Sequence, residues 1–238
     1  MKILVAIPCL YGADYVRESI KSVCYEDNVD VLLIDNGGDE HIKALIDIFY
    51  ADRINVHVIK NEKNLYVNKA WQQAIDWFLN LKEHSHLIIM NSDLFMQPNW
   101  SKVIFNRLAE NPEESIIPNI TDDKLFSSIP KGLEVAEATE VKSGTPGVFI
   151  MLNQKQAEKV SELPFDICKI WFGDEWIYTI LRNTGDKTIV PSNLFCHHLW
   201  SATLNQVEGI HALIEEDKKN WEEIGKPRMF KKIEELNG

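Results

Sequence analysis

The chain has 238 residues, of which 45% are hydrophobic and 26% charged, and its formal net charge is -11 at pH 7. This length fits one α/β domain with a modest extension, the composition excludes a disordered or fibrous protein, and the negative charge disfavours generic binding to nucleic acid or anionic membranes. No apolar stretch approaches the roughly 20 residues of a membrane span, and the four irregularly spaced cysteines indicate free thiols, so we expect a cytoplasmic protein.

The first half of the chain alternates apolar runs with amphipathic segments. Residues 2–8 (KILVAIP) and 29–35 (VDVLLID) are continuous apolar runs, typical of strands that are buried on both faces. Between them, residues 14–25 place apolar side chains at helical spacing. The alternation continues with a helix over 40–51, a strand over 54–60, a helix over 66–82 and a strand over 86–90. This order predicts an α/β fold with a wound, mostly parallel sheet flanked by helices.

The second half is less regular. We expect a helix over 99–112 and a short strand over 115–120, followed over 121–145 by an irregular, lid-like segment with weak periodicity. Further elements are a strand over 147–152, helices over 153–163 and 174–185, and a strand over 187–191. The charged tail from about residue 210 is predicted to be helical and to pack as an appendage.

Polar side chains follow the predicted strands at the sheet edge where ligands bind. In chain order these are Asp35, Asn36, Asn61, Asn64, Asn91 and Asp93. A carboxylate at the mouth of a sheet is well placed to hold a divalent cation that in turn binds a diphosphate. For Asp93 the alternative is a turn or helix-capping role. No Gly-rich phosphate loop follows any strand, so a Rossmann dehydrogenase or a P-loop protein loses its main support.

Several stretches together resemble the family 2 glycosyltransferases with the GT-A fold, which use nucleotide sugars. They are the first strand ending in AIP, then SIKSV, LLIDNGGDE, NEKNLYVNKA, MNSD at the place of the Asp-x-Asp motif, SGTPGVFIMLNQKQAEKVSELPFD, FGDEWIYTILRNTG and CHHLWSAT. The resemblance runs to about Thr203. It implies one domain over residues 1–205, divided into a nucleotide-binding half (1–95) and an acceptor-side half (96–205), with a helical extension over 206–238.

The resemblance also implies a reaction. An acceptor hydroxyl would attack the anomeric carbon of a nucleoside diphosphate sugar with inversion, while Mn²⁺ or Mg²⁺ stabilises the departing diphosphate. The acceptor stays open: a growing polysaccharide or lipopolysaccharide chain, a glycan, a small molecule or a modified base in DNA. The last of these is the least compatible with the net charge. Polysaccharide biosynthesis is a context that the resemblance implies.

Matching the family motifs residue by residue gives each position an expected role. Asp174 is the expected general base, with helix capping as its alternative, and Asp93 and His198 are the expected metal ligands. Only one of His197 and His198 is expected to face the site, because adjacent strand residues point to opposite faces. The remaining expected contacts to the nucleotide sugar are Pro8, Asp35, Asn36, Asn64, Asn91, Trp171 and Glu175.

Some of these roles have alternatives. Asp35 matches the aspartate that contacts the base, but it also precedes Gly37 and Gly38 and could be a turn residue. Trp171 is a candidate for stacking on a sugar ring, because it lies just before Asp174. Glu175 is the alternative to Asp174 as the general base.

Three positions depart from the family pattern. Asn91 replaces the first aspartate of the metal motif, Gly173 replaces a glutamate, and Tyr66 replaces a glycine. A catalytically degenerate module that binds a nucleotide or glycan is therefore an alternative function. A sugar-phosphate nucleotidyltransferase is a weaker one, because the chain lacks the Gly-rich opening loop with Arg and Lys that this chemistry uses.

Overall fold

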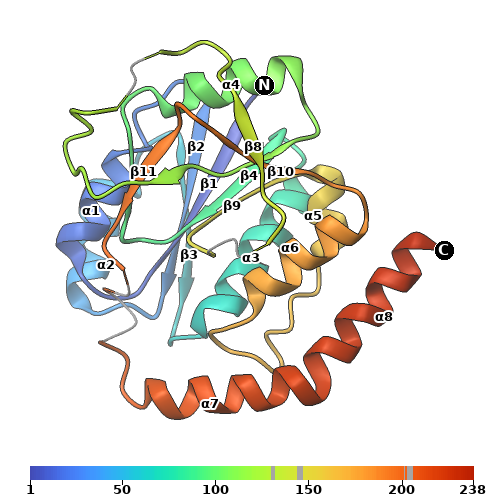
Figure 1. Ribbon diagram of the computed structural model, residues 1–238. Coiled ribbons are helices and arrows are strands. Elements are labelled where there is room, and N and C mark those ends of the chain that lie inside the picture. Colours follow the sequence, from blue (N-terminus) through green and yellow to red (C-terminus); the bar gives the residue numbers. More distant parts are fainter. Residues whose placement is uncertain (130–131, 144–146, 201, 203–205) are drawn as a thin grey trace.

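A five-stranded sheet with the strand order β3-β2-β1-β4-β9 forms the centre of the computed structural model (Figure 1). The structure describes residues 1–129, 132–143, 147–200, 202 and 206–238. Strands β1 to β4 run parallel to one another, and β9 is antiparallel to β4. The mostly parallel sheet predicted from the sequence is confirmed. The strands are β1 (Ile3–Cys9), β2 (Val29–Asn36), β3 (Val56–Asn61), β4 (His86–Met90) and β9 (Phe149–Asn153).

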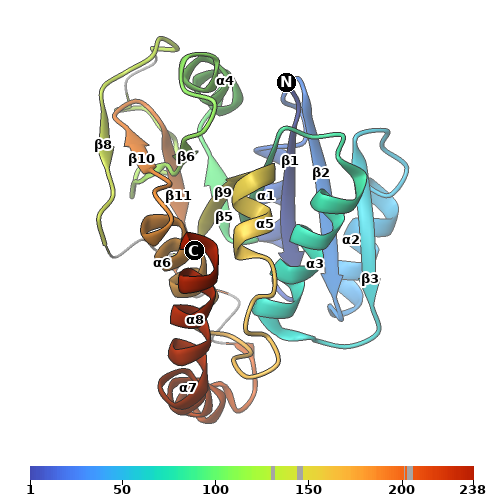
Figure 2. The ribbon, with the colours of Figure 1, turned by 90° about the vertical axis from the view of Figure 1, so that its right-hand side faces the viewer.

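Helices cover both faces of this sheet, which explains why a strand such as β2 is buried at every position. Two helices lie on one face, and two others lie side by side on the opposite face (Figure 2). The first pair is α1 (Ala13–Lys21) and α2 (Glu40–Phe49), and the second pair is α3 (Tyr66–Leu81) and α5 (Gln154–Val160). Because β3 leads through α3 back to β4 beside β1, the carboxyl ends of β1, β2 and β4 meet at one edge of the sheet.

Two small three-stranded sheets accompany the central one, with the strand orders β6-β10-β8 and β5-β11-β7. The predicted strand over 115–120 is in fact two strands in different sheets, since Pro118 between them has no N–H for a ladder. Within 121–145 the structure places a strand that the weak periodicity did not predict. The elements are β5 (Leu94–Met96), α4 (Trp100–Glu110), β6 (Ser115–Ile116), β7 (Asn119–Ile120), β8 (Ala138–Glu140), α6 (Gly173–Asn183), β10 (Thr188–Pro191) and β11 (Phe195–His198).

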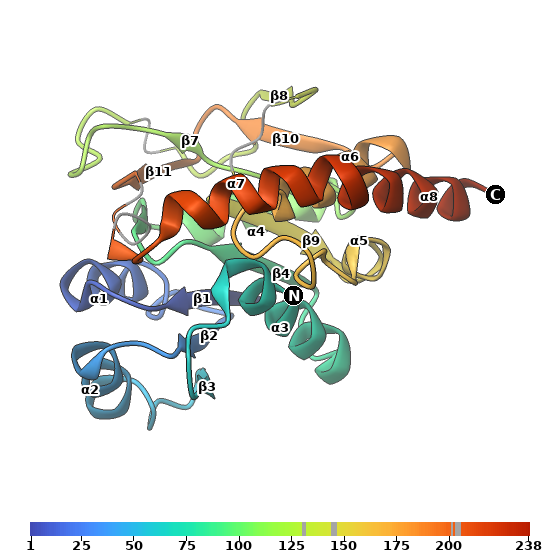
Figure 3. The ribbon, with the colours of Figure 1, turned by 90° about the horizontal axis from the view of Figure 1, so that it is seen from below.

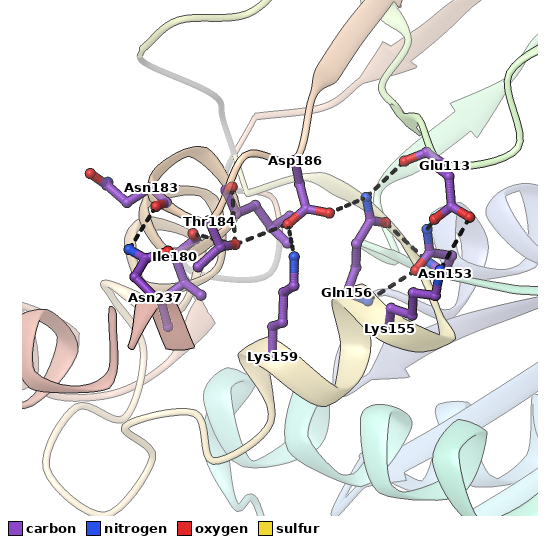
Figure 4. A network of polar contacts seen from close by, with 11 residues as sticks. Glu113, Asn153, Lys155, Gln156, Lys159, Ile180, Asn183, Thr184, Asp186 and Asn237 are labelled. Atoms are coloured by element: carbon purple, nitrogen blue, oxygen red, sulfur yellow. Dashed lines mark hydrogen bonds and ion pairs between the residues drawn. The ribbon is translucent and has the colours of Figure 1, made fainter. Parts of the chain in front are cut away.

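Helix α6 is tied to its neighbours by a polar network (Figure 4). Just after α6, Asp186 pairs with the ammonium of Lys159 from α5 at 2.5 Å and accepts a hydrogen bond from the Thr184 hydroxyl at 2.9 Å. From the last helix, the Asn237 amide donates to the Asn183 carbonyl oxygen at 3.1 Å. These contacts fix the far end of α6, whose first turn carries Asp174.

The expected helical extension is present and packs into the domain. It consists of α7 (Ile210–Asn220), a π-helical segment (Trp221–Gly225) and α8 (Lys226–Asn237), which run one after another along the underside of the molecule (Figure 3). Trp221 is only 1% exposed, and its ring stacks on Phe172 at a centroid distance of 5.0 Å. The extension is therefore part of the domain core and not a loosely attached appendage.

Replacing Trp221 with alanine is expected to lower the free energy of unfolding by about 3–5 kcal/mol, because a buried indole is lost and a cavity is left. Urea unfolding followed by circular dichroism measures the change. Phe230→Ala in the same extension is the matched control, since Phe230 is 54% exposed, and it should change the free energy by no more than about 0.5 kcal/mol. Equal losses in both variants would contradict the packing described here.

Within the described part of the chain, none of the helices has the length and apolar character needed to cross a membrane. All four cysteines are free and buried, which agrees with the absence of a disulfide framework predicted from their spacing. Burial raises the pKa of the Cys168 and Cys196 thiols to about 12. These thiols therefore stay protonated at neutral pH, when they are poor nucleophiles.

Candidate functional site

A pocket of about 330 Å³ opens at the carboxyl ends of the central strands. Its walls come from the ends of β1, β2 and β4, the start of α3, the residues before and within the first turn of α6, and the segment that leads into α7. Eight of the ten residues predicted for the site line this pocket: Pro8, Asn36, Asn64, Asn91, Asp93, Trp171, Asp174 and His198. The fold thus brings together motifs that are up to 190 residues apart in the sequence.

Asp35 and Glu175 are not among the residues that line the pocket. Asp35 is 3% exposed, and its carboxylate accepts a hydrogen bond from the Gly38 N–H at 2.7 Å. Asp35 thus has the turn role that is the alternative to contacting the base. The Glu175 carboxylate lies on the exposed side of α6 and accepts a hydrogen bond from the Thr179 hydroxyl at 3.2 Å.

Asp93 and His198 face each other at the floor of the pocket. His198 Nε2 lies 3.1 Å from Asp93 Oδ1, and the two side chains are 3% and 6% exposed, respectively. The second oxygen, Oδ2, accepts a hydrogen bond from the Ala202 N–H at 3.2 Å. Strand β11 pairs with β5 so that His198 is opposite Leu94, the residue after Asp93. Ser201 and Thr203 of the CHHLWSAT stretch lie outside the described residues.

The two adjacent histidines point to opposite sides of β11, as the strand geometry predicts. His197 places Nδ1 2.8 Å from the Thr121 carbonyl oxygen and stacks on Phe95 at 5.9 Å. His198 lines the pocket and meets the edge of the Trp200 ring at 4.6 Å. Within this pair, His198 is the one that can contact a ligand in the pocket.

A cluster of neutral amides includes two pocket-lining residues, Asn36 and Asn64. The Asn36 amide nitrogen donates to Asn64 Oδ1 at 3.2 Å, and the Asn61 amide nitrogen donates to Asn36 Oδ1 at 3.1 Å. Asn64 Oδ1 also accepts from the Tyr66 N–H at 2.8 Å. Tyr66 has a φ of 65°, a left-handed backbone conformation that glycine adopts more readily than a bulky residue, and it lines the pocket.

Asp174 lies in the first turn of α6 and is half-buried. Its Oδ1 accepts a hydrogen bond from the Glu175 N–H at 2.9 Å, whereas the cap position of the helix belongs to Phe172. Burial raises the pKa of the Asp174 carboxyl above its ordinary value of 3.8. Gly147 packs directly on this carboxylate, because a Cβ there would lie 2.7 Å from Asp174 Cβ. A half-buried carboxylate with a raised pKa is suited to accept a proton near neutral pH.

Gly173 leaves no space for the glutamate that the family pattern has. A Cβ at Gly173 would lie 2.2 Å from Asn68 Oδ1 and 3.1 Å from the Trp71 ring. The Asn68 amide is fixed in turn, because it donates to the carbonyl oxygens of Cys168 and Trp171 at 2.8 and 2.9 Å. This departure is therefore matched to the packing of α3 against the residues before α6.

Gly173→Ala is expected to lower the free energy of unfolding by about 1–3 kcal/mol, because the new methyl group overlaps Asn68. The measurement is urea unfolding of the purified variant. Gly132→Ala serves as its control, since a Cβ at Gly132 would meet its nearest neighbour at an ordinary 3.5 Å. A destabilisation of the control as large as that of Gly173→Ala would contradict the steric reason.

The donor groups in the pocket are few. The described residues contain no cluster of three or more His, Cys, Asp or Glu side chains that could hold a metal ion. Asp93 and His198 supply one carboxylate and one imidazole, a donor set that suits a divalent cation when a ligand provides further oxygens. The described pocket residues include no Lys or Arg that could neutralise a diphosphate. The donor set thus fits a cation held jointly by protein and ligand.

Several pocket residues were not identified from the sequence. Trp200, which is 56% exposed, lies two residues after His198, so the histidine motif is the one local signal for it. Val207 and Ile210 line the pocket from the segment that leads into α7. Their side chains carry no catalytic signature, and only the three-dimensional path of the extension brings them here.

Residues 4–133, more than half of the chain, match the sequence profile described as Glycosyl transferase family 2. An uncharacterized protein of Methanocaldococcus jannaschii is 24% identical over 89 residues, which are 37% of this chain and 39% of that protein. The chain therefore spans well under half of that relative.

Solved structures share the fold at low sequence identity. GalNAc-T7 with UDP, GalNAc and Mn²⁺ has a TM-score of 0.65 at 14% identity, covering 83% of this chain and 44% of that one. Residues 1–349 of S. aureus TarS with UDP give 0.64 at 15% identity, covering 92% and 68%. The mannosyltransferase PcManGT from Pyrobaculum calidifontis with GDP-Man and Mn²⁺ gives 0.60 at 12% identity, covering 92% and 61%. These likenesses confirm the GT-A fold that the sequence motifs predicted.

Proposed function

The chain belongs to glycosyl transferase family 2, and from this premise we propose that it moves a sugar from a nucleoside diphosphate sugar to an acceptor hydroxyl with inversion. The observation that carries the proposal is one pocket lined by Asp93, His198 and Asp174. The first two supply donor atoms for a cation, and the third is a carboxylate with a raised pKa. This is the pair of functions that inverting transfer requires.

Asp93 and His198 would hold Mn²⁺ or Mg²⁺ together with the diphosphate of the donor. When bound, the cation supplies positive charge against the leaving diphosphate. The fit rests on the donor chemistry of the buried pair and on the lack of Lys or Arg among the described pocket residues. Two of the structural neighbours are described with Mn²⁺, which supports the same cofactor here.

Asp174 would act on the acceptor. Its carboxylate accepts the hydroxyl proton as the acceptor oxygen forms a bond to the anomeric carbon. The bond from that carbon to the diphosphate oxygen breaks, and the nucleoside diphosphate leaves with the electron pair. Trp171, 44% exposed beside Asp174, offers a ring face on which a sugar can stack.

The remaining assignments follow the division into a nucleotide-binding half (1–95), an acceptor-side half (96–205) and a helical extension (206–238). Pro8 and the amides of Asn36, Asn64 and Asn91 would contact the donor from the first half. The acceptor would be a glycan, a polysaccharide or another hydroxyl compound in the cytoplasm, and the net charge of -11 disfavours nucleic acid.

A binding module without turnover is the second candidate, favoured by Asn91 in place of a metal-binding carboxylate. An amide adds no negative charge for a cation, so Asn91 would weaken metal dependence.

The experiment that tests the proposal is calorimetric titration of UDP, GDP and dTDP, each with manganese and with EDTA. Metal-dependent binding of one nucleotide is the expected result, and it names the base of the donor. Incubation with the matching nucleotide sugars then separates the candidates, because an enzyme releases the nucleoside diphosphate and a binding module does not. If no nucleotide bound under any condition, the proposed function would be wrong.

A further inference from the structure

The loop of residues 168–172 connects the pocket to α6 and is held from both sides. It carries Trp171 to the pocket wall and leads directly into the helical turn that bears Asp174. On one side, α3 binds the loop's carbonyl groups through Asn68, whose amide donates to Cys168 and Trp171. The backbone N–H of Asn68 adds a hydrogen bond to the Lys169 carbonyl oxygen at 3.1 Å.

On the other side, one carboxylate of the helical extension binds the N–H groups of the same loop. Asp217 of α7 is 1% exposed, and its Oδ1 accepts from the Lys169 N–H at 2.8 Å. Its Oδ2 accepts from the N–H groups of Ile170 and Trp171 at 2.7 and 2.9 Å. Hydrogen bonds to an ionised carboxylate are among the strongest in proteins, and these three compensate for burying the charge.

The end of the loop is strained and is also held by the extension. Phe172 has a φ of 68°, a conformation that a bulky residue adopts only when its surroundings enforce it. Its ring stacks on Trp221 with an interplanar angle of 5°. The segment that leads into α7 lines the pocket as well, through Val207 and Ile210. The extension thus touches the loop, the start of α6 and the pocket itself.

We infer that Asp217 is a positioning residue for sugar transfer, which sets the place of Trp171 and Asp174 through the loop of residues 168–172. Asp217 is not among the described residues that line the pocket, so it acts through the loop and not on the substrate. A carboxylate suits this task because it offers two acceptor oxygens to three successive N–H groups, whereas an asparagine offers one. The inference rests on the proposed function.

The first test follows the loop itself and needs no substrate. Hydrogen exchange of the amides of residues 169–171 is measured in the wild type, Asp217→Ala, Asp217→Asn and Glu216→Ala. Glu216 is the matched control, because it is exposed on the same helix and carries the same charge. We expect exchange to be about tenfold faster or more in Asp217→Ala, intermediate in Asp217→Asn and unchanged in the control. Unchanged exchange in both Asp217 variants would overturn the inference.

The second test compares binding with turnover. The probes are UDP-sugars and GDP-sugars with manganese, and the readouts are nucleoside diphosphate affinity and the rate of nucleoside diphosphate release with acceptor sugars present. We expect Asp217→Ala to bind the nucleotide within about twofold of the wild type, because Asp93, Asn36 and Asn64 lie on other elements. Its kcat should fall on the order of a hundredfold, since small displacements of catalytic groups cost this much. Asp217→Asn should be intermediate.

The outcomes are distinguishable from failure of the proposed function. If wild-type protein binds no nucleotide, the sugar-transfer proposal fails, while the exchange data still decide whether Asp217 orders the loop. If the loop exchanges faster in Asp217→Ala but its kcat equals that of Glu216→Ala, the positioning role is wrong. Should Asp217→Ala not fold, Asp217→Asn carries both tests, because it keeps the size of the side chain and one acceptor oxygen.

Discussion

Replacing Asp93 with alanine is expected to abolish the manganese-dependent binding of a nucleoside diphosphate. Asp93 is the carboxylate that faces His198 at the pocket floor. Without the cation, the described pocket residues include no Lys or Arg that could neutralise the diphosphate instead. Turnover of the nucleotide sugar should fall by at least about a hundredfold, since a metal that stabilises the leaving group supplies several kcal/mol. Calorimetric titration with and without EDTA measures binding, and release of the nucleoside diphosphate measures turnover.

Two further variants complete the experiment on Asp93: one at the second proposed metal ligand and one as a control. His198→Ala should lose the same metal dependence, because the imidazole is the other protein donor in the pair. Asp52→Asn removes one negative charge at an exposed position, so it should bind and turn over like the wild type. If Asp93→Ala kept full manganese-dependent binding, the cation would be held elsewhere, and the assignment of the pocket floor would be wrong.

The central sheet could be predicted because each strand carries its own signal. Apolar residues dominate β1, β2 and β4, and polar residues mark two of the strand ends: Asp35 and Asn36 end β2, and Asn91 directly follows β4. Strands such as β8 (Ala138–Glu140) are short and largely exposed, so their sequences show no hydrophobic periodicity. Their existence depends on pairing with β10, far along the chain, which no local pattern encodes.

The site residues likewise differ in how much local sequence signal they carry. Asp93 could be proposed from the strand that it ends, but its pairing with His198 depends on the register of β5 with β11, a hundred residues later. For Asp35 the local sequence was ambiguous, because a carboxylate before two glycines can either stabilise a turn or bind a ligand. In the structure its carboxylate accepts a hydrogen bond from the Gly38 N–H. Asp217 had no local signal, since a buried carboxylate on a charged helix resembles its exposed neighbours in sequence.

The three departures from the family pattern bear on whether the chain is an enzyme or a binding module without turnover. Gly173 is required by the position of Asn68, and Tyr66 has a φ of 65°, a left-handed backbone conformation that glycine adopts readily. Asn91 continues the pairing of β4 with β9 through its N–H to the Val148 carbonyl oxygen at 3.0 Å. Two of the three departures are thus compensated locally without loss of Asp93 or Asp174, which favours a working enzyme.

Asp174→Asn is the second variant for which we expect a large effect. An amide cannot accept the acceptor proton, so kcat/KM should fall by about 10²–10⁴-fold, the usual contribution of a general base. In the wild type, kcat/KM should be low at acid pH, rise through the pKa of Asp174 and then level off. Because burial raises this pKa, the rise should lie above pH 3.8, the ordinary value for the group. In Asp174→Asn this rise should be absent.

Thermal stability distinguishes two reasons why Asp174→Asn could lose activity: loss of the general base and misfolding. A carboxyl whose pKa is higher in the folded state contributes stability below its unfolded pKa and loses it as the pH rises through the folded pKa. Removing this charge should therefore raise the Tm of Asp174→Asn at neutral pH while activity falls. Glu175→Gln tests the adjacent carboxylate, which lies on the exposed side of α6. If Glu175→Gln lost the activity and the pH dependence while Asp174→Asn kept both, Glu175 would be the base and the geometry of the pocket would have to change on ligand binding.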